Sequence, residues 1–142
     1  MKEKKRYVGV VVKMDDKVLL CKRNNRGSFP GMWSVPAGSI EKDEKSRDAG
    51  VREFKEETNI TIKPDDLTFT GIVPRTSRDG KFVKGYMYVY LHEPKEILFP
   101  DLENAVDGEE HTECGYFTWN QISKMNTGTQ LKHLLEVILG KI

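Results

Sequence analysis

The sequence lacks the features of a secreted or membrane-spanning protein. No stretch of its 142 residues approaches the ~18 consecutive apolar residues that suggest a membrane-spanning helix. The run after the basic N-terminus is too short and too interrupted by charge to be the apolar part of a secretory signal, so we expect no leader. Lysine and arginine number 23 against 22 aspartates and glutamates, a net charge of +1 that gives no reason to expect a nucleic-acid polymer or an anionic membrane as partner.

Cysteine and histidine are also scarce. Cys21 and Cys114 are the only cysteines, and one distant pair does not make a disulfide framework, so we expect reduced thiols and a cytoplasmic protein. The three histidines are not spaced like metal ligands, and we interpret His92, His111 and His133 as ordinary residues. No Ser–His–Asp or Cys–His set is evident, which argues against a covalent mechanism.

Hydrophobic patterning predicts one domain of strands and helices over residues 1–142. Runs rich in β-branched and aromatic residues predict strands at 7–12, 18–21, 33–35, 67–73, 82–91 and 116–119. A helix is expected from near Asp43 to about Thr58, with Asn59 as a left-handed stop. The acidic stretch 92–113 has no clear periodicity and is expected to be a loop. A C-terminal amphipathic helix is predicted by apolar residues at helical spacing: Leu131, Leu134, Leu135, Ile138 and Leu139.

The first of these helices carries a concentrated set of acids. Glu53, Glu56 and Glu57 are spaced i, i+3 and i+4, so their carboxylates project from one helix face. Such a face can be merely solvated, but unpaired anions repel, and a hard cation such as Mg²⁺ prefers oxygen ligands of this kind. Gly38 and Glu44 lie upstream in register, which favours the metal-binding interpretation.

The full spacing resembles a known motif. From Gly38 the chain reads Gly, five residues, Glu44, seven residues, then Arg52-Glu53-Phe54-Lys55-Glu56-Glu57-Thr58-Asn59-Ile60. This resembles the Nudix box, G-x5-E-x7-R-E-U-x-E-E-x-G-U, where U is a bulky aliphatic or aromatic residue. Asn59 stands where the family has Gly, and Ala37 replaces a common first Gly, but neither change touches a carboxylate. The resemblance implies an α/β fold, a mixed β-sheet sandwiched between α-helices (an α/β/α sandwich), with the box as loop–helix–loop.

The resemblance also implies residue roles. Metal ligands carry over to Glu53, Glu56, Glu57 and the backbone carbonyl of Gly38, for Mg²⁺ or alternatively Mn²⁺. Arg52 would orient the carboxylates, with Glu44 as a supporting acid. For the catalytic base we rank Glu53 first, because it occupies a fixed motif position, and Glu113 second. Several relatives place a further ligand or base in the region before the last strand, which here also holds Glu109 and Glu110; a solvated acidic loop is the alternative.

Two basic groups could bind phosphate: Lys22, Arg23 and Arg26, and Arg75, Arg78, Lys81 and Lys84. We select Arg23 and Arg75, since both lie near strand ends that should face the motif, although scattered surface charge is the alternative. Some aromatic residues could stack on a base, although aromatics near strands more often belong to the core: Phe29, Trp33, Tyr116 and Phe117.

The expected function is hydrolysis of a diphosphate linkage in a nucleoside diphosphate joined to another group. The expected partner is a small nucleotide, with nucleic acid relevant only as capped RNA and no membrane. Nucleoside triphosphates, ADP-ribose, dinucleoside polyphosphates and sugar nucleotides all remain open. A non-catalytic module that binds a nucleotide or a protein is the alternative, and the intact set of glutamates argues against it.

Overall fold

The computed structural model describes residues 4–26, 30–77 and 79–141. These described residues form seven strands: β1 (Lys5–Met14), β2 (Lys17–Arg23), β3 (Trp33–Ser34), β4 (Ala37–Ser39), β5 (Thr68–Thr76), β6 (Val83–His92) and β7 (His111–Thr118). The α-helices are α1 (Ser46–Thr58), α2 (Trp119–Ile122) and α3 (Thr129–Ile138), and the 3-10 turns are η1 (Pro64–Asp66) and η2 (Gly108–Glu110). Within these described residues, no helix combines the length and the hydrophobicity that crossing a membrane requires.

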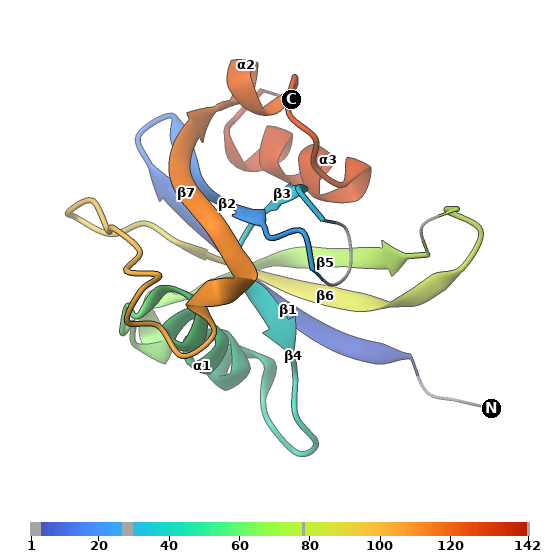
Figure 1. Ribbon diagram of the computed structural model, residues 1–142, viewed down its shortest axis with the longest axis horizontal. Coiled ribbons are helices and arrows are strands. Elements are labelled where there is room, and N and C mark those ends of the chain that lie inside the picture. The colour runs from blue at the N-terminus through green and yellow to red at the C-terminus, as the bar shows by residue number, and fades with distance from the viewer. Residues whose placement is uncertain (1–3, 27–29, 78, 142) are drawn as a thin grey trace.

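The strands form a mixed sheet in the order β3-β2-β1-β6-β5, with β4 also paired to β1 and β7 to β2 (Figure 1). The pair β1–β6 is parallel, and the other pairs are antiparallel. The valine run of β1 suits its central place, because a strand covered on both faces is apolar throughout rather than alternating. The mixed sheet expected from the sequence is confirmed.

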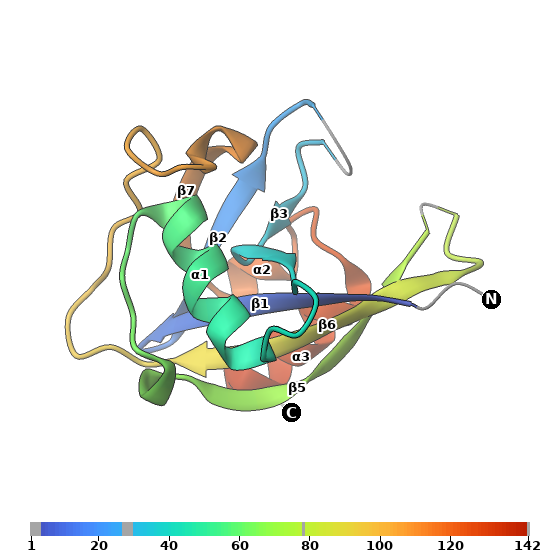
Figure 2. The ribbon, with the colours of Figure 1, turned by 90° about the horizontal axis from the view of Figure 1, so that it is seen from below.

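Helices cover both faces of the sheet, as the sequence predicts (Figures 1 and 2). Val8, Val10 and Val12 of β1 pack in one cluster with Ala49 and Phe54 of α1. Val11 points the other way and shares a second cluster with buried residues of α3. The apolar stripe of the predicted C-terminal helix faces that cluster: Leu131 and Leu135 are buried, and Leu134, Ile138 and Leu139 are partly buried against it.

Several element boundaries differ from those expected. Helix α1 begins at Ser46 because Asp43 has a left-handed backbone with φ 65°, which a helix cannot include. It ends as predicted, with Asn59 at φ 63°. Strand β7 begins at His111, inside the stretch expected to be a loop, since pairing with β2 satisfies the backbone of a segment whose side chains are largely polar.

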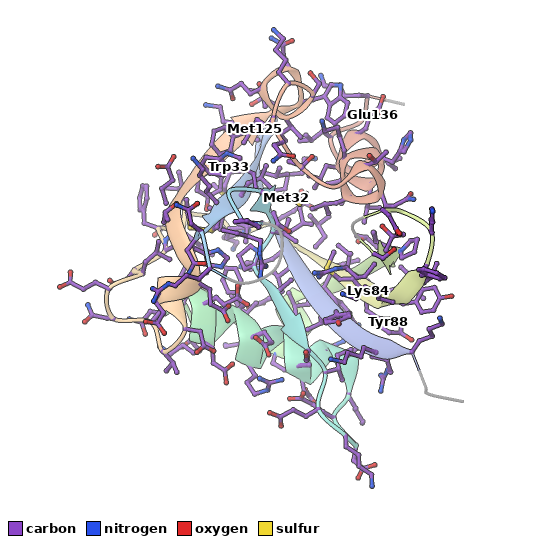
Figure 3. The ribbon with its side chains drawn as sticks, turned by 45° about the vertical axis from the view of Figure 1, so that its right-hand side comes forward. Met32, Trp33, Lys84, Tyr88, Met125 and Glu136 are labelled. Atoms are coloured by element: carbon purple, nitrogen blue, oxygen red, sulfur yellow. A yellow bond between two sulfur atoms is a disulfide. The ribbon has the colours of Figure 1, made fainter. Side chains whose placement is uncertain are left out.

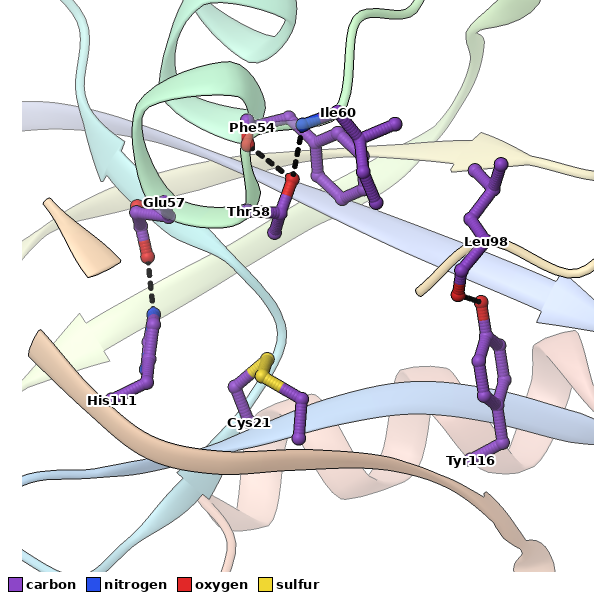
Figure 4. Close-up of a disulfide and its surroundings, with 9 residues drawn as sticks. Cys21, Phe54, Glu57, Thr58, Ile60, Leu98, His111 and Tyr116 are labelled. Atoms are coloured by element: carbon purple, nitrogen blue, oxygen red, sulfur yellow. Dashed lines mark hydrogen bonds and ion pairs between the residues drawn. A yellow bond between two sulfur atoms is a disulfide. The ribbon is translucent and has the colours of Figure 1, made fainter. Parts of the chain in front are cut away.

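Cys21 of β2 and Cys114 of β7 are joined by a disulfide (Figure 4). The two residues are directly opposite in the strand register, with their Cα atoms 4.0 Å apart, although 93 positions separate them in sequence. The expectation of two reduced thiols is therefore wrong. Sequence spacing could not show this pairing, because only the register of β2 against β7 places the two side chains face to face.

Candidate functional site

The three box glutamates are positioned by the way α1 packs. Phe54 is fully buried, and Gly50 lets the helix approach β1 closely: a Cβ there would lie 3.3 Å from Cγ2 of Val8. This anchoring directs the carboxylates of the neighbouring positions toward β4. Gly38 of β4 meets them so closely that a Cβ at this position would overlap the carboxylate of Glu53.

Arg52 ties the acidic groups together. Its Nε and Nη2 donate to the two carboxylate oxygens of Glu44, both at 2.9 Å. Its Nη1 donates to Glu53 at 2.9 Å and to Glu56 at 3.2 Å, and Nη2 also donates to the carbonyl of Ser39 at 3.0 Å. The bond to Arg52 lowers the pKa of Glu44, and the carboxylates keep the pKa of Arg52 high. This is the geometry expected of an arginine that orients carboxylates.

Two of the glutamates are held where a charge is unfavourable. Burial raises the pKa of Glu53 to about 7, with Glu57 and Glu56 adding repulsion that the hydrogen bond from Arg52 partly offsets. Burial also raises the pKa of Glu57 well above its ordinary value, followed by repulsion from Glu110. Oε2 of Glu57 is buried and has no hydrogen-bond partner in the described part of the chain. A cation would satisfy this oxygen and relieve the repulsion, so the donor set fits a divalent metal ion.

His111 belongs to this site, and its interpretation as an ordinary residue is wrong. Its Nε2 lies 2.6 Å from Oε1 of Glu57 in a hydrogen bond between side chains that are each 2% exposed (Figure 4). Burial lowers the pKa of His111, and the charge of Arg23 lowers it further. Glu57, Glu110 and His111 can each offer a ligand atom, all within 4.8 Å of one another.

A register shift explains why the sequence missed this histidine. Lys22 pairs with Glu113, but the next residue of β2, Arg23, pairs with His111, so β7 carries an extra residue there. The bulge turns His111 toward α1. The resemblance offered Glu110 among the acids before the last strand, but no local spacing relates His111 to the box.

Glu113 does not join the carboxylates of α1. The adjacent Cys114 packs with the cluster beneath α1, and successive side chains of a strand point to opposite faces. Glu113 is exposed, and it shares a row with Lys22 and Trp33 on the other face. In that region the structure instead brings Glu110 near Glu57.

The two selected arginines line one cleft of about 430 Å³. Arg23 lines this cleft, and its partner in the strand register is His111, which contacts Glu57. The guanidinium of Arg75 lies over the ring of Tyr7, 4.8 Å from its centroid. Arg78, the other arginine of the second basic group, lies outside the described residues.

The aromatic candidates for base stacking are engaged within the fold. Trp33 and Phe117 meet edge to face with centroids 5.1 Å apart, and both pack against the core. The hydroxyl of Tyr116 donates to the carbonyl of Leu98 at 2.6 Å. Phe29 lies outside the described residues.

Comparisons with known proteins agree with this geometry. The family model described as the NUDIX domain matches residues 3–137. The m7GpppN-mRNA hydrolase NUDT17 of Danio rerio is 44% identical over 64 residues, covering 42% of this chain and 21% of that protein. The nucleoside triphosphatase NudI of Salmonella newport is 38% identical over 77 residues, covering 54% of this chain and 51% of that protein. The chain thus spans about half the length of its NudI relative and a smaller part of NUDT17.

Solved structures show the same fold. The MutT NUDIX hydrolase of Burkholderia pseudomallei superposes with a TM-score of 0.72 at 22% identity, covering 99% of both chains. The NUDIX domain of Shewanella oneidensis NrtR, solved with ADP ribose, gives a TM-score of 0.74 at 20% identity, covering 98% of this chain and 90% of that one. At such low identities the likeness establishes the architecture alone.

Proposed function

This chain belongs to the Nudix family, and from that membership we propose that it is a metal-dependent hydrolase of nucleotides that contain a diphosphate linkage. The observation that carries the proposal is the set of Glu53, Glu56 and Glu57 on one face of α1, in which Arg52 bonds to Glu53 and Glu56 and Gly38 lies against Glu53. A module that only binds would not require this complete set of carboxylates.

Glu53, Glu56, Glu57 and the carbonyl of Gly38 would hold Mg²⁺, with Mn²⁺ as the alternative. When bound, the ion would neutralise charge on the phosphoryl oxygens and lower the pKa of an attacking water. Arg52 keeps two of the carboxylates in place through its hydrogen bonds. Among the described residues, the ligand atoms that already lie within 4.8 Å of one another belong to Glu57, Glu110 and His111, so Glu53 and Glu56 would complete the set when the ion binds.

Glu53 is our first candidate for the base that removes a proton from the water. It occupies a fixed position of the motif; in the metal-free protein burial raises the pKa of its carboxylate to about 7, and a bound cation would lower that pKa. Glu113 was the second candidate, and its position on the far face of β7 gives it no support. Glu110, beside Glu57, is the better placed alternative from that region.

The substrate is proposed at the level of a nucleotide. Nucleoside triphosphates come first, because the NudI relative is named as a nucleoside triphosphatase and covers more of this chain than NUDT17 does. Capped RNA and ADP-ribose follow, from the names of NUDT17 and of the NrtR complex. We propose that the chain acts as one domain in the cytoplasm, although the disulfide removes the argument from reduced thiols.

The experiment follows hydrolysis products by chromatography over a nucleotide panel with Mg²⁺ or Mn²⁺, using wild-type protein and Glu56→Gln. We expect excess EDTA to abolish turnover and Glu56→Gln to lower kcat at least ~10²-fold with an unchanged circular dichroism spectrum, because the metal loses a charged ligand. Glu41→Gln is the matched control, since the Glu41 side chain is 70% exposed at the edge of the network. Full turnover in EDTA, or by Glu56→Gln, would refute the proposal.

A further inference from the structure

The cleft lined by Arg23 and Arg75 extends to the first turn of α3. Its lining includes Arg23, Ser34, Arg75, Thr127, Gly128 and Thr129. The segment that leads into α3 is fixed against β3, because the N–H of Trp33 donates to the carbonyl of Asn126 at 2.9 Å. Met32, Trp33 and Met125 lie near one another at this junction (Figure 3). The start of α3 therefore forms one wall of the cleft.

Thr127 carries a buried polar group without a partner. The residue is 9% exposed, it lines the cleft, and its Oγ1 forms no hydrogen bond with any described residue. A buried hydroxyl left without a partner costs free energy, and the cost disappears when a ligand accepts its hydrogen bond. A buried hydroxyl without a partner at the wall of a cleft indicates that the cleft binds a polar group of a ligand.

The first turn of α3 offers further donors. Gly128 is the N-cap residue and has no side chain to cap the helix. The N–H groups of a first helical turn lack intrahelical acceptors, and the helix dipole makes that end partly positive. Together with the Thr127 hydroxyl, this end of the ten-residue helix α3 has the chemistry of an anion site.

Two guanidinium groups supply positive charge to the same cleft. Burial lowers the pKa of Arg75, and the nearby charge of Arg23 contributes to the lowering. Among the described residues, no carboxylate forms an ion pair with Arg75. No described lining residue is aromatic, and the arginines and hydroxyl groups share the cleft with apolar side chains: Met32, Val73, Pro74, Met87 and Leu131.

We propose that this cleft binds a phosphate group of the substrate in addition to the two phosphates of the cleaved linkage. Arg75 and the Thr127 hydroxyl would donate to it together with the first turn of α3, while Arg23 bridges toward the metal-binding carboxylates. The inference rests on the proposed function, which places the cleaved diphosphate at Glu53, Glu56 and Glu57. The extra phosphate can be the end of a longer phosphate chain or a phosphomonoester on the sugar.

The first test measures binding without catalysis. ¹⁵N-labelled protein in EDTA is titrated with inorganic phosphate, and amide shifts are followed by NMR. We expect saturable shifts in the first turn of α3, and an affinity lowered about tenfold in Thr127→Val and in Arg75→Gln. Thr127→Ser should keep the affinity. Absence of shifts at the start of α3, or unchanged affinity in Thr127→Val, would overturn the proposal.

Two controls separate binding from folding. Arg6→Gln removes another arginine that lies over a tyrosine ring, that of Tyr88 at 5.5 Å, but Arg6 does not line the cleft. It should bind phosphate like the wild type. Thr127→Val removes an unpartnered hydroxyl from a buried position, so its melting temperature should be equal to or above that of the wild type while phosphate binding falls.

The second test identifies the source of the phosphate. KM is measured with Mg²⁺ for a nucleoside diphosphate, the triphosphate, and the diphosphate with a phosphate on its ribose, using wild type and Thr127→Val. A rise in KM of about tenfold for the triphosphate alone assigns the site to the phosphate chain, and one for the ribose phosphate alone assigns it to the sugar. If KM is unchanged for all substrates while Glu56→Gln is inactive, the proposal that the cleft binds a phosphate is overturned and the proposed hydrolase activity stands. If phosphate binds in the cleft while Glu56→Gln is fully active, the cleft proposal stands and the proposed metal-dependent hydrolase is overturned.

Discussion

Replacing Gly38 with alanine should damage the site while leaving the fold intact. The new Cβ would overlap the carboxylate of Glu53, so that side chain must move. Because the overlapping atoms are at the free end of a flexible side chain, the backbones of β4 and α1 can stay in place. The displaced carboxylate would lose its 2.9 Å hydrogen bond from Arg52 and its position as a ligand.

The size of the effect follows from that hydrogen bond. A bond between charged groups contributes ~1.5–3 kcal/mol, and the same loss at the transition state lowers kcat roughly 10- to 150-fold. The assay is steady-state hydrolysis at saturating Mg²⁺, with the melting temperature measured in parallel. Gly71→Ala is the matched control, because a Cβ there meets its nearest neighbour, Cδ1 of Leu134, at an ordinary 3.8 Å. Wild-type kcat in Gly38→Ala would show that the close approach of Gly38 to Glu53 has no functional role.

Three further predictions concern the pKa of Glu53, the contact between His111 and Glu57, and the disulfide. Because burial raises the pKa of Glu53 from 4.5 to about 7, the folded protein loses stability as pH rises across that window. In EDTA at pH 8, Glu53→Gln should therefore have a free energy of unfolding above that of the wild type by at most about 3 kcal/mol, and this difference should vanish near pH 4.5. A difference that stays constant with pH would contradict the raised pKa. His111→Ala should lower the free energy of unfolding by ~1–3 kcal/mol, because Oε1 of Glu57 loses its buried hydrogen-bond partner. The same variant should bind Mn²⁺ more weakly in calorimetry, and wild-type values in both measurements would exclude His111 from the site. The disulfide between Cys21 and Cys114 cross-links a long loop, so reducing it should lower the free energy of unfolding by up to about 4 kcal/mol. A denaturant midpoint that is unchanged in dithiothreitol would contradict this prediction.

The sequence predicted those features that depend on local spacing. The i, i+3, i+4 glutamates lie on one face of α1, Asn59 ends that helix, and the leucine stripe of α3 faces the core. Arg23 and Arg75 line one cleft. Their role in binding substrate remains a prediction.

The features that the sequence missed depend on the pairing of distant strands. The register of β2 against β7 places Cys21 opposite Cys114, and the bulge at Arg23 turns His111 toward Glu57 and leaves Glu113 on the other face. A shift of one residue in a strand reverses the face of every side chain. No local pattern in the acidic stretch before β7 encodes that shift.

The central place of β1 has a consequence for the order of folding. Lys5 pairs with Gly85 and Val12 with His92, so the first strand of the chain completes its parallel ladder only with the sixth. Closing so long a loop is entropically costly and slows folding relative to proteins built from local contacts. During synthesis, β1 and the helix with the three glutamates must wait for β6 to emerge, and β7 emerges later still. Cys114 therefore leaves the ribosome only after β1 and β6, the strands against which α1 packs.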